Sequence, residues 1–127
     1  MIDVVVSDHN PQDVEVKRLP FADAAPGAVG IETMLPVGLR LVHDKSLSLL
    51  KLLRAMSTRP AELLDIQAGS LRPGAPADVI LFDADMPWVL DRSTLKSRCS
   101  NSPFDEARLS GRVLRTIVAG RTVYEYV

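Results

Sequence analysis

The residues best suited to chemistry lie near the start of the chain, in the stretch Ser7-Asp8-His9-Asn10-Pro11-Gln12. It follows the apolar run Val4-Val5-Val6, which is typical of a strand that is buried on both faces. Asp8 lies two residues after that run, at the end of the expected strand, and Pro11 stops the strand from continuing. Because a buried parallel strand presents a carboxylate to an active-site rim in this way, we predict that Asp8 is a catalytic residue.

The element that must position Asp8 is therefore a strand over residues 2–7. A long irregular segment follows over residues 8–30, and loops of this length in compact domains are usually functional or disordered. A strand buried on both faces needs a neighbour on each side, and nothing in the sequence precedes this one. We therefore expect the chain to be the last part of a longer protein.

Three helices are predicted next. The first runs over residues 31–42, with Pro36 in its first turns; the second begins after an N-cap at Ser46; the third spans residues 57–66. In the second helix, Leu49, Leu52, Leu53 and Met56 form an apolar stripe that indicates packing against a core.

Strands dominate the rest of the chain. We predict them over residues 77–82, 88–90, 113–118 and 122–127, with a loop over residues 97–103 and a hairpin turn at residues 119–121. Residues 1–66 thus form one unit, a strand with a loop and helices, and residues 67–127 form a small β-rich unit. Neither unit makes a self-sufficient core.

The bulk composition excludes several classes of protein. The 127 residues carry a net charge of −1, so no basic surface indicates nucleic-acid binding. No apolar run is long enough to span a membrane, and no signal peptide is recognisable. Cys99 is the only cysteine, which excludes an intrachain disulfide and fits a reducing cytoplasm.

Several stretches together resemble one family. Ser7 to Gln12 is similar to the Asp-His-Ala-Pro-His motif of dihydroorotases, which belong to the amidohydrolase superfamily. Residues 25–33 resemble the family's loop leading into Gly-x-Glu-Thr, and residues 69–78 resemble the superfamily's Gly-x-Leu-x-x-Gly-x-x-Ala-Asp turn. Asn101-Ser102-Pro103-Phe104 resembles the Asn-Thr-Pro-Phe of dihydroorotases in particular. The resemblance covers essentially the whole chain, but only the last third of such an enzyme.

The resemblance implies an α/β fold, namely the C-terminal fragment of a (β/α)8 TIM-barrel metal-dependent hydrolase. Residues 1–66 would be the last barrel strand and the closing helices, and residues 67–127 part of a small sandwich-like β-rich subdomain. It implies an oligomer that acts on a small molecule, with no nucleic acid and no membrane as partners.

The resemblance also implies an activity. Dihydroorotases reversibly close N-carbamoyl-L-aspartate to dihydroorotate in pyrimidine biosynthesis, using zinc to activate water and polarise the carbonyl. In that role Asp8 would bind the metal and move the proton, while the backbone of Pro26 and Gly27 would contact the substrate. Gln12 replaces the motif histidine that binds the substrate carboxylate; glutamine donates a hydrogen bond but carries no charge.

The remaining zinc ligands are not in this sequence. It has only His9 and His43, and neither forms a His-x-His pair, so the isolated chain is predicted to be inactive. Two alternatives remain open, and the departure at Gln12 favours the first. One is a non-catalytic structural partner of aspartate carbamoyltransferase, and the other is a hydantoinase-like or allantoinase-like cyclic amidohydrolase.

Other polar residues favour ordinary structural roles. His9 is predicted to be packed or hydrogen-bonded, Glu32 to lie in the first turn of a helix, and His43 to sit at a helix C-terminus in solvent. Cys99 is expected to be unreactive. Lys17 and Arg18 are expected to be a solvated pair, close enough to the predicted site to matter for an anionic substrate.

Overall fold

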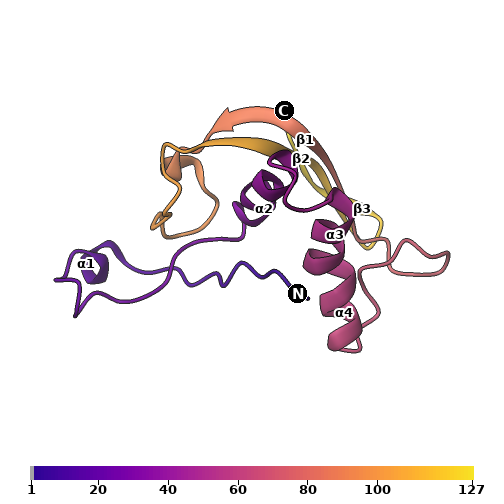
Figure 1. Cartoon of the computed structure of the whole chain (residues 1–127), viewed down its shortest axis with the longest axis horizontal. Helices are drawn as coiled ribbons and strands as arrows, with labels where there is room; N and C mark the ends of the chain where they lie inside the picture. The colour runs from indigo at the N-terminus through magenta and orange to yellow at the C-terminus, as the bar shows by residue number, and fades with distance from the viewer. Residues whose placement is uncertain (1) are drawn as a thin grey trace.

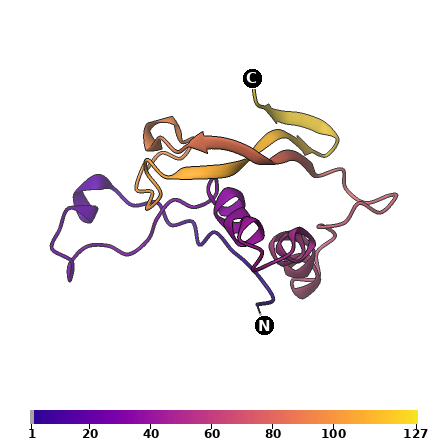
Figure 2. The ribbon, with the colours of Figure 1, turned by 45° about the horizontal axis from the view of Figure 1, so that its top comes forward.

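A three-stranded antiparallel sheet forms one layer of the molecule in a computed structural model that describes residues 2–127. Its strands are β1 (Val79–Val89), β2 (Arg108–Val118) and β3 (Arg121–Glu125), in the order β1-β2-β3. Helices α2 (Met34–His43), α3 (Leu49–Leu53) and α4 (Arg59–Leu63) lie on one side of this sheet (Figure 2). The predicted α/β class is therefore confirmed.

The core lies between the helices and the sheet. Leu39 and Leu52 are fully buried, and Leu35 joins them. Phe82 of β1 and Val113 of β2 pack against this cluster from the other layer. Residues on both sides of position 66 thus contribute to one core.

The helices begin later than the sequence indicates. Helix α2 starts at Met34 rather than residue 31, although Pro36 lies in its first turn as predicted. The N-cap of α3 is Ser48 and not Ser46, because the Ser46 N–H donates to the Asp44 carboxylate at 2.9 Å within a separate turn.

The two helices predicted around residue 57 form a continuous helical body. A π-helical turn, Arg54–Thr58, joins α3 to α4 without a break. Pro60 explains the wider turn, because it has no N–H to donate to the carbonyl four residues earlier. The apolar stripe packs as expected, with Leu49 and Met56 against buried Leu52.

Strand β1 unites the two strands predicted over residues 77–82 and 88–90. Its pairing with β2 shifts register between Asp83 and Pro87, where the Asp83 carboxylate accepts hydrogen bonds from the Asp85 and Met86 N–H groups. Such a bulge keeps one strand continuous through residues that local propensity assigns to a loop. Strand β2 starts at Arg108, earlier than predicted, and the hairpin turn to β3 lies where the sequence placed it.

The predicted strand over residues 2–7 is not a strand in the structure. The segment is extended and runs past the helices toward the loop that carries α1 (Val14–Lys17), as Figure 1 shows. Val5 N–H donates to the Ala55 carbonyl at 3.0 Å, yet Val6 is 70% exposed. The prediction was wrong here because strand pairing needs a neighbour, and within residues 2–127 no strand lies beside this segment.

The segment over residues 8–30 is irregular as predicted, apart from the short helix α1 and a parallel bridge between His9 and Ala28. None of the helices formed within residues 2–127 has the length and apolar character needed to cross a membrane.

Candidate active site

Asp8 lies at an abrupt change of direction between the extended segment and the loop. Its backbone has a φ of 44°, a left-handed conformation that aspartate tolerates better than most residues with side chains. Its side chain is exposed and has no hydrogen-bond partner among the described residues. The carboxylate is therefore open to a ligand or to other groups.

His9 has a structural role. Its Nδ1 accepts hydrogen bonds from the Gly30 N–H at 3.0 Å and the Ile31 N–H at 3.4 Å. These bonds tie the residue after Asp8 to the entrance of helix α2. The prediction of a hydrogen-bonded structural histidine is confirmed.

Gln12 is joined to the Pro26–Gly27 loop through its neighbours. Its side-chain amide donates to Asn10 Oδ1 at 2.9 Å, and Asn10 Nδ2 in turn lies 3.4 Å from the Pro26 carbonyl oxygen. The backbone N–H of Gln12 donates to Asn101 Oδ1 at 3.1 Å. Gln12 and Pro26 thus belong to one hydrogen-bonded group, and Gly27 joins this group through Asn101.

Asn101 completes that group, although the sequence marked it only as part of a motif. Its Nδ2 donates to the Gly27 carbonyl at 3.1 Å, while its own carbonyl accepts from the Val29 N–H at 3.3 Å. One asparagine therefore links Gln12 to the loop on the other side. The signal in the sequence was Asn-Ser-Pro-Phe, but no local pattern could say what the asparagine contacts.

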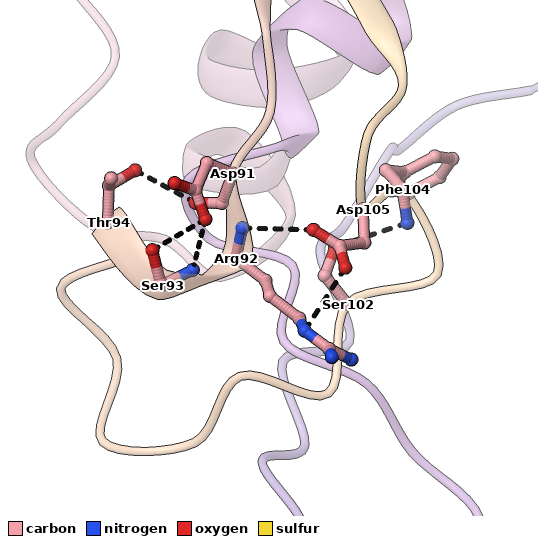
Figure 3. Close-up of polar contacts among 7 residues, drawn as sticks. All are labelled: Asp91, Arg92, Ser93, Thr94, Ser102, Phe104 and Asp105. Carbon is pink, nitrogen blue, oxygen red and sulfur yellow. Dashed lines mark hydrogen bonds and ion pairs between the residues drawn. The ribbon is translucent and has the colours of Figure 1, made fainter.

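Hydrogen bonds and an ion pair join the two ends of the loop that carries Asn101 (Figure 3). Backbone hydrogen bonds join Leu90 to Ala107 and Glu106, and Arg92 meets the Asp105 carboxylate through its backbone N–H and its guanidinium, both at 3.1 Å. Asp91 accepts hydrogen bonds from the Ser93 hydroxyl and N–H. The Ser93 hydroxyl and N–H lower the pKa of Asp91, so this contact is present at neutral pH and is lost as the pH falls through that lowered value.

Glu32 binds the same loop through backbone N–H groups in its middle part. Its carboxylate accepts from the Lys96 N–H at 2.7 Å and the Ser97 N–H at 3.3 Å. The prediction that Glu32 lies in the first turn of a helix was wrong, because α2 begins only at Met34 and the carboxylate serves two loop N–H groups instead. His43 does lie at the C-terminus of α2, where its Nε2 is 3.3 Å from an Asp85 carboxylate oxygen.

Lys17 and Arg18 differ in their surroundings. Lys17 Nζ donates to the Ala25 carbonyl at 2.8 Å and the Gly27 carbonyl at 3.2 Å, whereas Arg18 pairs with Glu15 on the surface. An open hollow of about 600 Å³ lies beside them. Its lining contains three cationic side chains and no carboxylate: Val14, Lys17, Arg18, Gly27, Ala28, Arg92, Ser100, Asn101, Ser102 and Pro103.

The residues at this site do not make a zinc centre by themselves. A catalytic zinc takes about three protein ligands and keeps one position open. Within residues 2–127, no group of three His, Cys, Asp or Glu side chains is placed to hold a metal ion. Asp8 supplies one candidate oxygen ligand, which is too few.

The sequence matches the profile of the amidohydrolase family over residues 2–123. It is 42% identical to a dihydroorotase of Ehrlichia chaffeensis, over 98% of this chain and 28% of that protein. A dihydroorotase of Syntrophus aciditrophicus is 43% identical over 98% of this chain and 29% of its own length. The chain therefore spans under a third of the length of these relatives, and the resemblance indicated by the motifs is confirmed.

Comparison with solved structures also indicates an amidohydrolase fold. An L-hydantoinase (dihydropyrimidinase) from Arthrobacter aurescens superposes with a TM-score of 0.90 at 36% identity, over 97% of this chain and 29% of that one. A D-hydantoinase (dihydropyrimidinase) from a Thermus species gives a TM-score of 0.86 at 24% identity, over 97% of this chain and 28% of its own, a likeness of fold alone. The predicted fold class, part of a TIM-barrel amidohydrolase, is confirmed.

Proposed function

The chain belongs to the amidohydrolase family, and on this premise we propose that it supplies the proton-transfer carboxylate and the substrate loop of a dihydroorotase-like enzyme. The whole protein would then interconvert N-carbamoyl-L-aspartate and dihydroorotate in cytoplasmic pyrimidine biosynthesis. Aspartate carbamoyltransferase, which makes N-carbamoyl-L-aspartate, is the partner enzyme that this proposal implies.

The observation that carries the proposal is the hydrogen-bonded group at the candidate site. Three stretches that match the family separately, residues 8–12, 25–33 and 101–104, are far apart in the sequence. Gln12, Gly27 and Asn101 bring them together through bonds at 3.1 Å. Each of these stretches matches the family on its own, and the hydrogen bonds place them in contact. A common site explains this contact better than chance does.

Asp8 has the chemistry that the reaction needs. Hydrolysis of a cyclic amide requires removal of a proton from the attacking water and return of a proton to the leaving ring nitrogen. An exposed carboxylate without a competing partner in the described residues can do both in turn. We assign this role to Asp8, with Gln12 and the backbone of Pro26 and Gly27 contacting the substrate.

Members of this family are generally metal-dependent, and a bound zinc ion activates water and polarises the carbonyl. We propose Asp8 as the one metal ligand from this chain. Since residues 2–127 do not hold a three-ligand group, the other ligands have to come from elsewhere in the whole protein.

A second candidate is a hydantoinase-like activity on a neutral cyclic amide. It is favoured by Gln12, which cannot offer a charge to a substrate carboxylate, and by the 36% identity to the L-hydantoinase. Of the three cations that line the hollow beside Gly27, Arg18 and Arg92 are paired with carboxylates. Lys17 pairs with no carboxylate within residues 2–127, and its charge favours the anionic substrate instead.

A chimera tests the choice between these activities. Residues 2–127 would replace the matching segment of the Syntrophus aciditrophicus dihydroorotase, which is 43% identical. We expect the chimera to hydrolyse dihydroorotate with a kcat/KM at least tenfold above its value for hydantoin, with the parent enzyme as control. A preference for hydantoin would support the second candidate, and a folded chimera that hydrolyses neither compound would contradict both.

A further inference from the structure

The carbonyl of Gly27 is held from two sides. Lys17 Nζ donates to its oxygen at 3.2 Å and Asn101 Nδ2 donates to the same oxygen at 3.1 Å. A carbonyl oxygen has two lone pairs, so both acceptor positions are occupied. The peptide that joins Gly27 to Ala28 therefore cannot rotate without breaking two hydrogen bonds.

The side-chain hydrogen bonds of Lys17 all go to this loop. Within residues 2–127 its ammonium pairs with no carboxylate, and it donates instead to the carbonyls of Ala25 and Gly27. Hydrogen bonds from a charged donor are about twice as strong as those between neutral groups. Arg18, next in the sequence, pairs with Glu15 at 3.3 Å and does not reach the loop.

The path of the loop leaves little room for adjustment. Gly27 has a φ of +117°, and a Cβ atom there would lie 2.6 Å from Asn10 Nδ2. The next residue, Ala28, forms the parallel bridge with His9, and its carbonyl accepts from the Asn10 N–H at 2.9 Å. Holding the Gly27 carbonyl therefore also sets how the loop meets the segment that carries Asp8.

The other side of the loop is available to a ligand. Among the described residues, the N–H of Gly27 donates to no protein acceptor, while Gly27 lines the hollow together with Lys17 and Asn101. This N–H belongs to the peptide that joins Pro26 to Gly27, whose carbonyl oxygen lies 3.4 Å from Asn10 Nδ2. A backbone donor without a protein acceptor, in a loop that is hydrogen-bonded on both sides of it, is suited to binding a carboxylate or carbonyl oxygen.

We propose that Lys17 and Asn101 are positioning residues that clamp the Gly27 carbonyl and so keep the loop in its substrate-binding conformation beside Asp8. The assignment of the loop to substrate rests on the proposed function. The clamp itself is a property of this chain and can be measured without substrate.

The first experiment measures amide hydrogen exchange by NMR in the 127-residue chain. Lys17→Met removes the donor and is expected to speed exchange of the Asn10 N–H about fivefold, because its bond to Ala28 loses support. Lys17→Arg, which keeps a charged donor, should restore exchange to within twofold of the unsubstituted chain. Arg18→Met is the matched control and should leave it unchanged. An Asn10 N–H that exchanges equally in all four chains would overturn the clamp.

Asn101→Asp separates the two bonds of the asparagine. A carboxylate still accepts from the Gln12 N–H but cannot donate to the Gly27 carbonyl, and it places oxygen against oxygen. The Asn10 N–H should again exchange about fivefold faster while the Gln12 N–H stays protected. Loss of protection at Gln12 alone would contradict the assignment of Asn101.

The second experiment separates the clamp from the proposed function. In the chimera, Lys17→Met is expected to raise KM for dihydroorotate about tenfold with kcat changed less than threefold, and Lys17→Arg to reverse the rise. An active chimera whose KM does not respond would overturn the positioning role. A chimera inactive even without substitutions would instead refute the proposed function, while the exchange measurements would still decide the clamp.

Discussion

Gln12 uses separate atoms for its two hydrogen bonds. The backbone N–H donates to Asn101, and only the bond to Asn10 depends on the side chain. A different side chain at position 12 could therefore keep the link to the loop of Asn101 while changing what it offers to a ligand. Under the proposed function, residue 12 is therefore a position at which substrate preference could change without loss of this link.

Gln12→His in the chimera tests that statement. A histidine donates a charge-assisted hydrogen bond to a carboxylate when it is protonated, which is worth about 1 kcal/mol more than the neutral amide bond. KM for dihydroorotate should fall about fivefold, whereas KM for hydantoin, which has no carboxylate, should stay the same. Steady-state kinetics on both compounds measure this, and an equal change for the two would contradict a role in carboxylate binding.

At the scale of elements, the site depends on the contact between helix α2 and strand β2. Gly111 in β2 is buried with a φ of +102°, and Leu39 of α2 occupies the space where a Cβ atom would lie. The turn just before helix α2 contains Gly30 and Glu32, which bind His9 and the loop before Asn101. Moving α2 away from the sheet would therefore disturb both sides of the site.

Gly111→Ala should accordingly destabilise the fold. The new Cβ would overlap Leu39 Cδ1, and we expect the free energy of unfolding to fall by about 2–4 kcal/mol. Gly120→Ala is the matched control, because Gly120 also has a positive φ of +77° but nothing within 4 Å of a Cβ atom. It should cost only about 1 kcal/mol. Urea denaturation gives both values, and equal losses would show that the contact with Leu39 is unimportant.

At the scale of the whole molecule, helices from the first half and strands from the second share one core. The exposed remainder includes large apolar side chains, such as Leu50 at 80% and Leu71 at 83% exposure. The chain spans 28% of the length of the Ehrlichia chaffeensis dihydroorotase that it resembles. Within residues 2–127 the molecule thus combines one shared core with a set of exposed apolar side chains.

The purified 127-residue chain should therefore bind less than one zinc ion per chain after dialysis against excess zinc. Asp8 alone cannot replace the usual three ligands, and no group of three candidate ligands exists within residues 2–127. Elemental analysis measures the metal, with the unsubstituted chimera as the positive control. One tightly held zinc ion, or dihydroorotate hydrolysis by the chain itself, would contradict this prediction.

Local sequence was sufficient for some of these features and insufficient for others. The helix with Pro36 and the hairpin turn at residues 119–121 were predicted because each depends on neighbouring residues. The partners of Asn101 and Glu32 were not, because they lie 89 and 64 residues away in the sequence. Residues 2–7 have strand propensity, but pairing is decided by neighbours and not by propensity.

The central claim, that Asp8 transfers the proton, is tested most directly by the kcat of the chimera with Asp8→Asn. Asparagine keeps the shape of the side chain and tolerates the left-handed backbone, but it cannot accept the proton. Asp3→Asn, an exposed carboxylate on the same extended segment, is the control. We predict that kcat for dihydroorotate hydrolysis falls about 10²–10⁴-fold for Asp8→Asn and stays within twofold for Asp3→Asn. A kcat within threefold of the unsubstituted chimera for Asp8→Asn would contradict the claim.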